Sequence, residues 1–295
     1  MKAKPKEEDK KDDNAKPKEV AVRDPTIKTF NLEKKPSDDN EKHIIDMLTC
    51  AALGDLTPVP DVDENLERYI EMGVNMRVED EKGEMPVHKL ARLKVEDKNR
   101  TAFRKCFREI IALMREQATK AGRKGIVSDI NHQDKAGKTP LYLAVEHKNL
   151  EMIDRLYELK QDGPDSILVN SVGWTVMHAA VNTDDLETLK ALVKHFTPAR
   201  TKVLLMTPDK TGREPLHIAA YKCSEEMVTY LIDLGAKNNK ADTAGNTASK
   251  LADRAGRRKS KEIIEEKLPE SVPPAPENKR RSKEIPEMPA QEKKE

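Results

Sequence analysis

Apolar side chains recur at intervals of three and four residues through the middle of the chain, and this spacing places them on one face of a helix. The two clearest stripes consist of Phe103, Phe107, Ile110, Ile111 and Met114, and of Met227, Tyr230, Leu231 and Leu234. Gly235 follows the second stripe directly, as expected of a helix stop signal. The pattern predicts amphipathic helices in the middle of the chain, whereas residues 1–41 and 269–295 hold few apolar side chains.

A nine-residue motif recurs five times in the same region, at 80–88, 134–142, 170–178, 209–217 and 242–250. Each copy begins with Asp or Asn, has glycine at its fourth position, and has Pro, Val or Ala at its seventh. An Asp or Asn followed by glycine suits a tight turn with positive φ. Proline in the first turn of a helix loses no hydrogen bond, because that N–H has no helical acceptor. Each copy therefore predicts a turn that leads into a helix.

The motif resembles the ankyrin repeat, whose signature is a glycine turn, Thr-Pro-Leu-His, a pair of small residues and a Leu-rich second helix. Thr139-Pro140-Leu141 and Pro215-Leu216-His217 match the signature, and pairs of small residues stand at Ala179-Ala180 and Ala219-Ala220. The resemblance implies an all-α ankyrin-repeat solenoid, built from helix-turn-helix units with β-turn fingers and flanked by disordered tails.

Four positions depart from that signature. Met85 and Glu214 stand where the family has Thr, and Tyr142 and Lys250 stand where it has His. The side-chain hydrogen bonds that brace the turn are therefore expected to be incomplete in those units. We expect uneven stability along the array, lowest in the second and last units.

Residues 42–268 are predicted to form one repeat domain of about six units. The predicted units are 43–75, 80–128, 134–165, 170–203, 209–238 and 242–268. The first and last depart most from the motif, as terminal units do when only one face has a neighbour. The second carries an insertion around Lys94 to Thr101, which predicts a long loop or an extended helix.

Charge is balanced over the whole chain and at both ends. The 295 residues include 54 Lys+Arg and 53 Asp+Glu, a net charge of +1, which gives no global attraction to polyanions. Residues 1–41 and 269–295 mix both charges with prolines, so we expect disordered tails. No apolar run is long enough to cross a bilayer, and no signal peptide is visible. We expect no membrane insertion, a cytoplasmic or nuclear location, and a chain that is monomeric alone.

Ankyrin domains characteristically bind other proteins through their turn tips and first helices, so the resemblance implies an unidentified protein partner on a concave face. The candidate contacts just after the turn glycines are Glu84, Lys138, Trp174, Arg213 and Asn246, which we name the turn row. Those late in the first helices are Arg92, Glu146, His147, Asn182, Thr183, Tyr221, Lys222 and Arg254, which we name the helix-end row. Trp174 is the leading contact. The alternative is that its ring is a structural shield along the stems of Lys138 or Arg213.

The histidines and cysteines are better explained by structural roles than by metal binding or catalysis. His88, His178 and His217 occupy the repeat's own His position, where the family uses His to brace the turn. The three cysteines, Cys50, Cys106 and Cys223, lie far apart, and no metal site, cofactor site or catalytic group is predicted.

Two serines and one basic cluster are candidates for regulation. Ser260 and Ser282 each follow basic residues and are candidate phosphorylation sites, although Ser260 could instead cap the last helix. The cluster at 279–283 is either a nuclear-import signal or a chance grouping of basic residues.

The sequence favours a non-catalytic adaptor or regulatory subunit. A narrower hypothesis is an inhibitor of a transcription factor resembling the NF-kappa-B inhibitors, which also have about six repeats. A hypothesis of another class is nucleic-acid or nucleotide binding, in which Trp174 stacks on a base and Lys138 and Arg213 hold phosphates. An enzyme is disfavoured, because no base and nucleophile are paired and no phosphate loop is present.

Overall fold

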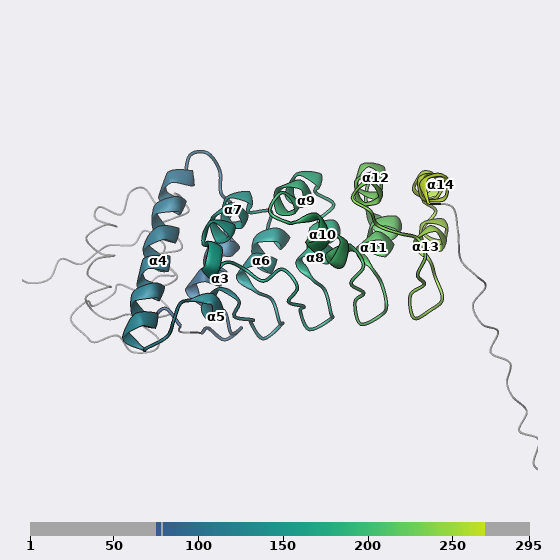
Figure 1. Ribbon diagram of the computed structural model, residues 1–295. Coiled ribbons are helices and arrows are strands. Elements are labelled where there is room, and N and C mark those ends of the chain that lie inside the picture. The colour runs from purple at the N-terminus through teal and green to yellow at the C-terminus, as the bar shows by residue number, and fades with distance from the viewer. Residues whose placement is uncertain (1–74, 78, 269–295) are drawn as a thin grey trace, which may run out of the picture.

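The computed structural model describes residues 75–77 and 79–268. Figure 1 shows an elongated row of helix pairs, with loops that project on one side of each pair. The part of the chain described here contains helices and no strand, as the sequence predicts. The predicted tails 1–41 and 269–295 and nearly all of the first predicted unit, 43–75, lie outside the described residues.

Two parallel rows of helices make up the array. The first-helix row is α3 (Pro86–Ala91), α6 (Pro140–Glu146), α8 (Val176–Asn182), α11 (Pro215–Lys222) and α13 (Ala248–Arg254). The second-helix row is α4 (Arg100–Lys120), α7 (Leu150–Glu158), α9 (Leu186–Val193), α12 (Glu225–Asp233) and α14 (Arg258–Lys267). The connections carry α5 (Val127–Ile130), η1 (Lys160–Asp162) and α10 (Pro198–Leu205). Neighbouring first helices pack on one another along the whole row, and in the second-helix row α7 packs on α9 and α12 on α14.

The insertion in the second unit lengthens a helix. After a short loop, α4 begins at Arg100 and runs for 21 residues, longer than any other described helix. The predicted bounds of two units also need adjustment, because 128 falls inside α5 and 203 falls inside α10.

The core lies between the two rows. All five residues of the predicted stripe from Phe103 to Met114 are buried, and Phe103 is completely inaccessible. In the later stripe Met227 and Leu231 are buried, whereas Tyr230 and Leu234 are partly buried against the core. Each buried CH₂ group stabilises the folded state by about 0.8 kcal/mol, and this burial drives the pairing of the two rows.

The fingers repeat one geometry. The five predicted turn glycines have φ between 74° and 86°, a region that other residues rarely adopt. In every finger the opening Asp or Asn accepts two backbone N–H groups; Asp134, for example, accepts from Ala136 and Lys138 at 2.8 Å each. Neighbouring fingers are then joined by backbone hydrogen bonds from Lys135 to Lys82, Ser171 to Ala136, Lys210 to Val172 and Thr243 to Thr211. This joining holds the fingers in one register.

Histidines brace the turns in the second, fourth and fifth predicted units. His178 Nδ1 accepts the backbone N–H of Thr175 at 3.2 Å, and its Nε2 donates to the carbonyl of Arg213 at 3.1 Å in the next finger. His88 and His217 make the corresponding two bonds even though Met85 and Glu214 replace Thr. The imidazole brace is therefore complete in these two units, contrary to expectation, because it uses the backbone of the substituted residue. The expectation is met at Met85 for the side chain alone, since methionine has no hydroxyl to make the bond that Thr175 Oγ1 makes with His178 Nδ1 at 2.9 Å.

The other two departures from the signature behave differently. Tyr142 replaces the histidine by accepting a hydrogen bond on its hydroxyl from Asn170 of the next finger, at 3.1 Å. Lys250 is exposed, and its finger is held instead by Asn238, whose amide oxygen accepts the N–H of Ser249 at 3.2 Å.

Candidate functional site

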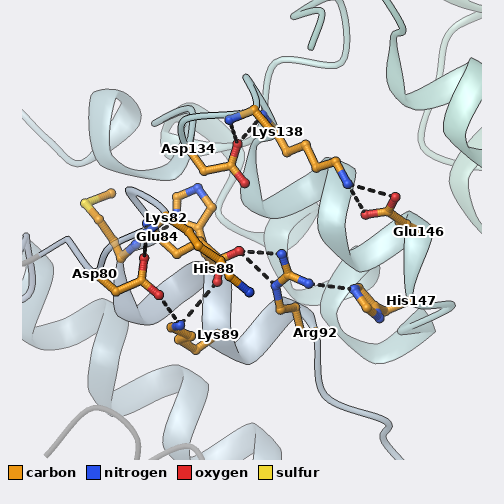
Figure 2. Close-up of polar contacts among 12 residues, drawn as sticks. Asp80, Lys82, Glu84, His88, Lys89, Arg92, Asp134, Lys138, Glu146 and His147 are labelled. Atoms are coloured by element: carbon orange, nitrogen blue, oxygen red, sulfur yellow. Dashed lines mark hydrogen bonds and ion pairs between the residues drawn. The ribbon is translucent and has the colours of Figure 1, made fainter. Parts of the chain in front are cut away.

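Members of the turn row pair with the helix-end row of the same unit in the N-terminal part of the face. Figure 2 shows two such pairs, Glu84 with Arg92 and Lys138 with Glu146, each formed by residues eight positions apart. The Lys138 ammonium lies 2.7 Å and 2.9 Å from the two Glu146 carboxylate oxygens. In each pair the cation is neutralised by a carboxylate of the protein itself.

Glu84 does not lie on the surface as expected of a contact residue. It is 3% exposed, and Arg92 donates to its carboxylate from Nε at 3.0 Å while Lys89 lies 3.3 Å away. Burial alone would raise the pKa of Glu84, but the Arg92 and Lys89 cations bring it below its ordinary value. Its carboxylate is an internal partner of these cations and is closed to a binding protein.

Asn246 is also buried, at 4% exposed, so the expectation of an open contact is again not met. Its side-chain amide donates to the carboxylate of Asp242 at 3.2 Å, within its own finger. The amide therefore stabilises the last finger.

Trp174 links two fingers. Its indole Nε1 donates to Asp209 Oδ2 at 3.1 Å, and its ring lies nearly parallel to His178, with 6.3 Å between ring centroids. Arg213 donates to the same carboxylate at 3.2 Å. Burial alone would raise the pKa of Asp209, but donors from Thr211, Arg213 and Trp174 lower it to about 2. Trp174 is only partly exposed, and its polar atom is already used within the array.

Replacing Trp174 by alanine should therefore lower the free energy of unfolding by about 2 kcal/mol, because packing and the bond to Asp209 are both lost. Phenylalanine should cost about 1 kcal/mol, because it keeps the ring and loses the N–H donor. Urea denaturation of the full chain measures both values. Tyr221→Ala is the matched control, and it should change stability by less than about 0.5 kcal/mol because the ring is exposed. Equal, negligible losses in all three variants would remove the structural role of Trp174.

The helix-end row also forms contacts between units. Arg92 lies 3.2 Å from His147 Nε2, and Lys222 Nζ donates to Asn182 Oδ1 at 2.7 Å. In both cases the last residues of one first helix contact those of the next. Thr183 donates its hydroxyl to the carbonyl of Ala180 at 2.7 Å and so stays within its own helix end.

Tyr221 and Arg254 differ from the rest of the helix-end row. Tyr221 is 57% exposed, and it is the most exposed of the large hydrophobic side chains that the structure describes. Arg254 is exposed too, and it stands at the corresponding position of the next unit, nine residues after the turn glycine. Within the described residues, neither side chain has an ion pair or a side-chain hydrogen bond. These two are the open positions of the candidate face.

The remaining candidates are either buried or outside the described residues. Burial raises the pKa of the Cys106 and Cys223 thiols to about 12, so neither is a thiolate near neutral pH. Ser260 is 2% exposed and lies in the first turn of α14, whereas the capping position belongs to Arg257. The capping expectation is therefore wrong, and modification of Ser260 would require this turn to open. Cys50, Ser282 and the cluster 279–283 lie outside the described residues.

The described residues show neither a metal site nor a membrane-spanning helix. They contain no group of three or more His, Cys, Asp or Glu side chains arranged to hold a metal ion. They also contain no helix that combines the length and apolar character needed to span a membrane.

Comparison with known families agrees with this geometry. The family model for ankyrin repeats in three copies matches residues 100–203 and again residues 157–242. The chain belongs to the ankyrin-repeat family. The helix rows and fingers described above are thus the first helices, second helices and β-turn fingers of ankyrin units.

Similar proteins include large and small ankyrin proteins. Mouse rabankyrin-5 is 25% identical over 187 residues, which is 63% of this chain and 14% of that protein. Mouse protein phosphatase 1 regulatory subunit 27 is 31% identical over 109 residues, 37% of this chain and 66% of that protein. The NF-kappa-B inhibitor cactus of Drosophila melanogaster is 31% identical over 107 residues, 36% of this chain and 20% of that protein. The matches span less than two thirds of each relative.

A solved structure supports the same fold. One chain in the complex of the predatory endopeptidase Bd0816 from Bdellovibrio bacteriovorus with immunity protein Bd3460 matches with a TM-score of 0.50 and 19% identity. The match covers 74% of this chain and 96% of that one. At this identity the likeness concerns the ankyrin fold alone.

Proposed function

We propose that this ankyrin domain is a non-catalytic adaptor or regulatory subunit that binds a partner protein along the face formed by its fingers and first helices. The observation that carries the proposal is the exposure of Tyr221 on that face, at the end of a first helix. Tyrosine is one of the residues that most often anchor protein interfaces. The similarity to a phosphatase regulatory subunit and to an NF-kappa-B inhibitor supports a regulatory role.

The experiment is site-specific photocrosslinking in the full chain. A photoreactive phenylalanine analogue replaces Tyr221 on the face in one form, and Val203 on α10 in a matched form. Val203 is 50% exposed, so the two probes are similarly accessible. We expect a protein adduct from position 221 and not from 203. Adducts at 203 alone, or equal adducts at both positions, would contradict binding on this face.

A narrower proposal is inhibition of a transcription factor, supported by the 31% identity to cactus over 107 residues. Its test is a pull-down of purified NF-kappa-B-type dimers by the full chain. Retention that Tyr221→Ala abolishes would support inhibition through this face, whereas no retention would exclude it.

The contacts of the turn row argue against nucleic-acid binding through that row. Lys138 is paired with Glu146, Arg213 with Asp209, and the indole N–H of Trp174 also donates to Asp209. Phosphates would have to displace carboxylates that are already in place.

A further inference from the structure

Positive charge is balanced by carboxylates in the N-terminal part of the face and not in its C-terminal part. In the second and third units Arg92 and Lys138 each contact a glutamate. In the fifth unit Lys222 contacts Asn182, a neutral amide, and forms no ion pair within the described residues. In the last unit, Arg254 has no ion pair among the described residues. The face therefore changes from neutral to positive along the array.

One nearby carboxylate adds negative charge: Asp184 accepts the N–H and the hydroxyl of Ser224 at 2.9 Å each and has no ion pair within the described residues. Three others are bound elsewhere, so the cations at this end of the face stay in excess. Asp253 forms an ion pair with Lys261 of α14, with 3.0 Å between Nζ and Oδ1. Asp209 holds Arg213, and Glu214 is buried with Lys240 at 3.0 Å. Lys250 on α13 is exposed and adds a further cation that has no ion pair within the described part of the chain.

The pattern of contacts between neighbouring helix ends explains why the side chain of Tyr221 has no polar partner. Arg92 reaches His147 of the next unit, and Lys222 reaches back to Asn182 in the same way. The next such contact would join Tyr221 to position 255, which is Ala255 and has no polar side chain. Tyr221 is therefore left without a neighbour's polar group, directly beside Lys222 in sequence and on α11, which packs against the helix of Arg254.

We propose that this end of the face, Tyr221, Lys222, Lys250 and Arg254, binds an acidic segment of the partner protein, rich in Asp and Glu. This inference rests on the proposed function and specifies the chemistry of the partner. The three cations would attract and pair with carboxylates, while Tyr221 packs against the segment's backbone or apolar side chains and donates its hydroxyl. In the N-terminal part of the face, where Arg92 and Lys138 are paired with glutamates, contacts with the partner would depend on shape complementarity more than on charge.

A peptide rather than a nucleic acid fits these residues better. The patch holds one exposed aromatic ring, whereas single-stranded nucleic acids are held by several stacked along a basic groove. The phenol of Tyr221 adds a hydrogen-bond donor for carboxylates beside the cations.

The test measures fluorescence anisotropy of a labelled peptide of alternating Glu and Gly residues, titrated with the full chain at low salt. Replacing Lys222 and Arg254 together by alanine should weaken binding by about tenfold, and raising the salt concentration should weaken binding to the parent chain. Lys124→Ala together with Lys202→Ala is the matched control, because it also removes two exposed cations, one before α5 and one on α10, away from α11 and α13. It should change the affinity by less than about twofold. Circular dichroism checks that every variant is folded.

Several outcomes would overturn the inference. Equal weakening by the control variant at Lys124 and Lys202, or no weakening by the variant at Lys222 and Arg254, would place the binding elsewhere in the chain. Tighter binding of a single-stranded oligothymidine with the same dependence on Lys222 and Arg254 would assign the patch to nucleic acid. If the peptide fails to bind while position 221 still gives a protein adduct, the acidic partner is wrong and the proposed function stands.

Discussion

Gly137→Ala should lower the free energy of unfolding by about 3 kcal/mol, which would make it one of the most damaging single-methyl additions in the array. Gly137 has φ of 74°, so any other residue is strained there. Its added Cβ would also lie 2.8 Å from the backbone nitrogen of Ser171 and 3.0 Å from Cα of Asn170. These atoms belong to the next finger, which would have to move.

Gly245→Ala separates the two causes of that loss. Gly245 has nearly the same φ, 78°, but a Cβ there meets no atom within 4 Å. Its replacement should therefore cost only the conformational strain, about 1–2 kcal/mol. Urea denaturation of the full chain gives both values. Equal losses would mean that the close approach of the next finger to Gly137 contributes nothing.

Acidification from pH 6.5 to about 4 should remove about 3 kcal/mol of stability for each of His88 and His178. Burial, which disfavours the charged imidazole, lowers both pKa values to about 4 from the ordinary 6.5. Between these values the unfolded chain binds protons that the folded chain does not, so stability falls as the pH falls. Below about pH 4 the contribution of these two groups becomes constant. Asp209, with a pKa of about 2, loses its contribution in a lower window, between 3.8 and about 2.

The measurement is the free energy of unfolding from urea curves across this pH range, together with the imidazole signals in NMR spectra of the folded chain. Those of His88 and His178 should remain in the neutral form down to about pH 4. The His178→Gln variant should have a smaller pH dependence over the same range, because one of the two groups is gone. A parent chain whose stability is flat from pH 6.5 to 4 would contradict the assignment of these imidazoles as buried and neutral.

Much of this fold could be predicted from the sequence because the repeated motif carries local rules. The glycine of each finger needs positive φ, and proline or a small residue begins the helix, so five turns could be placed without coordinates. The helical spacing of Phe103 to Met114 likewise predicted a buried stripe. The bracing by His88 and His217 could not be judged from their neighbours Met85 and Glu214, because the imidazole bonds to the backbone and not to the replaced side chain.

The candidate face was harder to predict, because exposure depends on pairs of side chains. The position of Glu84 after its turn glycine suggested a surface residue, yet Arg92 and Lys89 close over it. One signal was present in the sequence: Glu84 with Arg92, and Lys138 with Glu146, are opposite charges separated by eight residues. The turn-to-helix geometry of the repeat turns that spacing into contact. Trp174 gave no such signal, since its acceptor Asp209 lies 35 residues away.

The hydrogen bonds between fingers all run in one direction. Lys135, Ser171, Lys210 and Thr243 each donate their N–H to a carbonyl of the finger before them. By the same geometry the carbonyl of Ala244 stands at the acceptor position on the C-terminal side of the last finger, and the N–H of Glu81 stands at the donor position on the N-terminal side of the first described finger. The two sides of each finger therefore differ: the side toward the preceding finger presents an N–H donor, and the side toward the following finger presents a carbonyl acceptor. A further unit on the C-terminal side of the last described finger would therefore have to supply a backbone N–H donor to the carbonyl of Ala244.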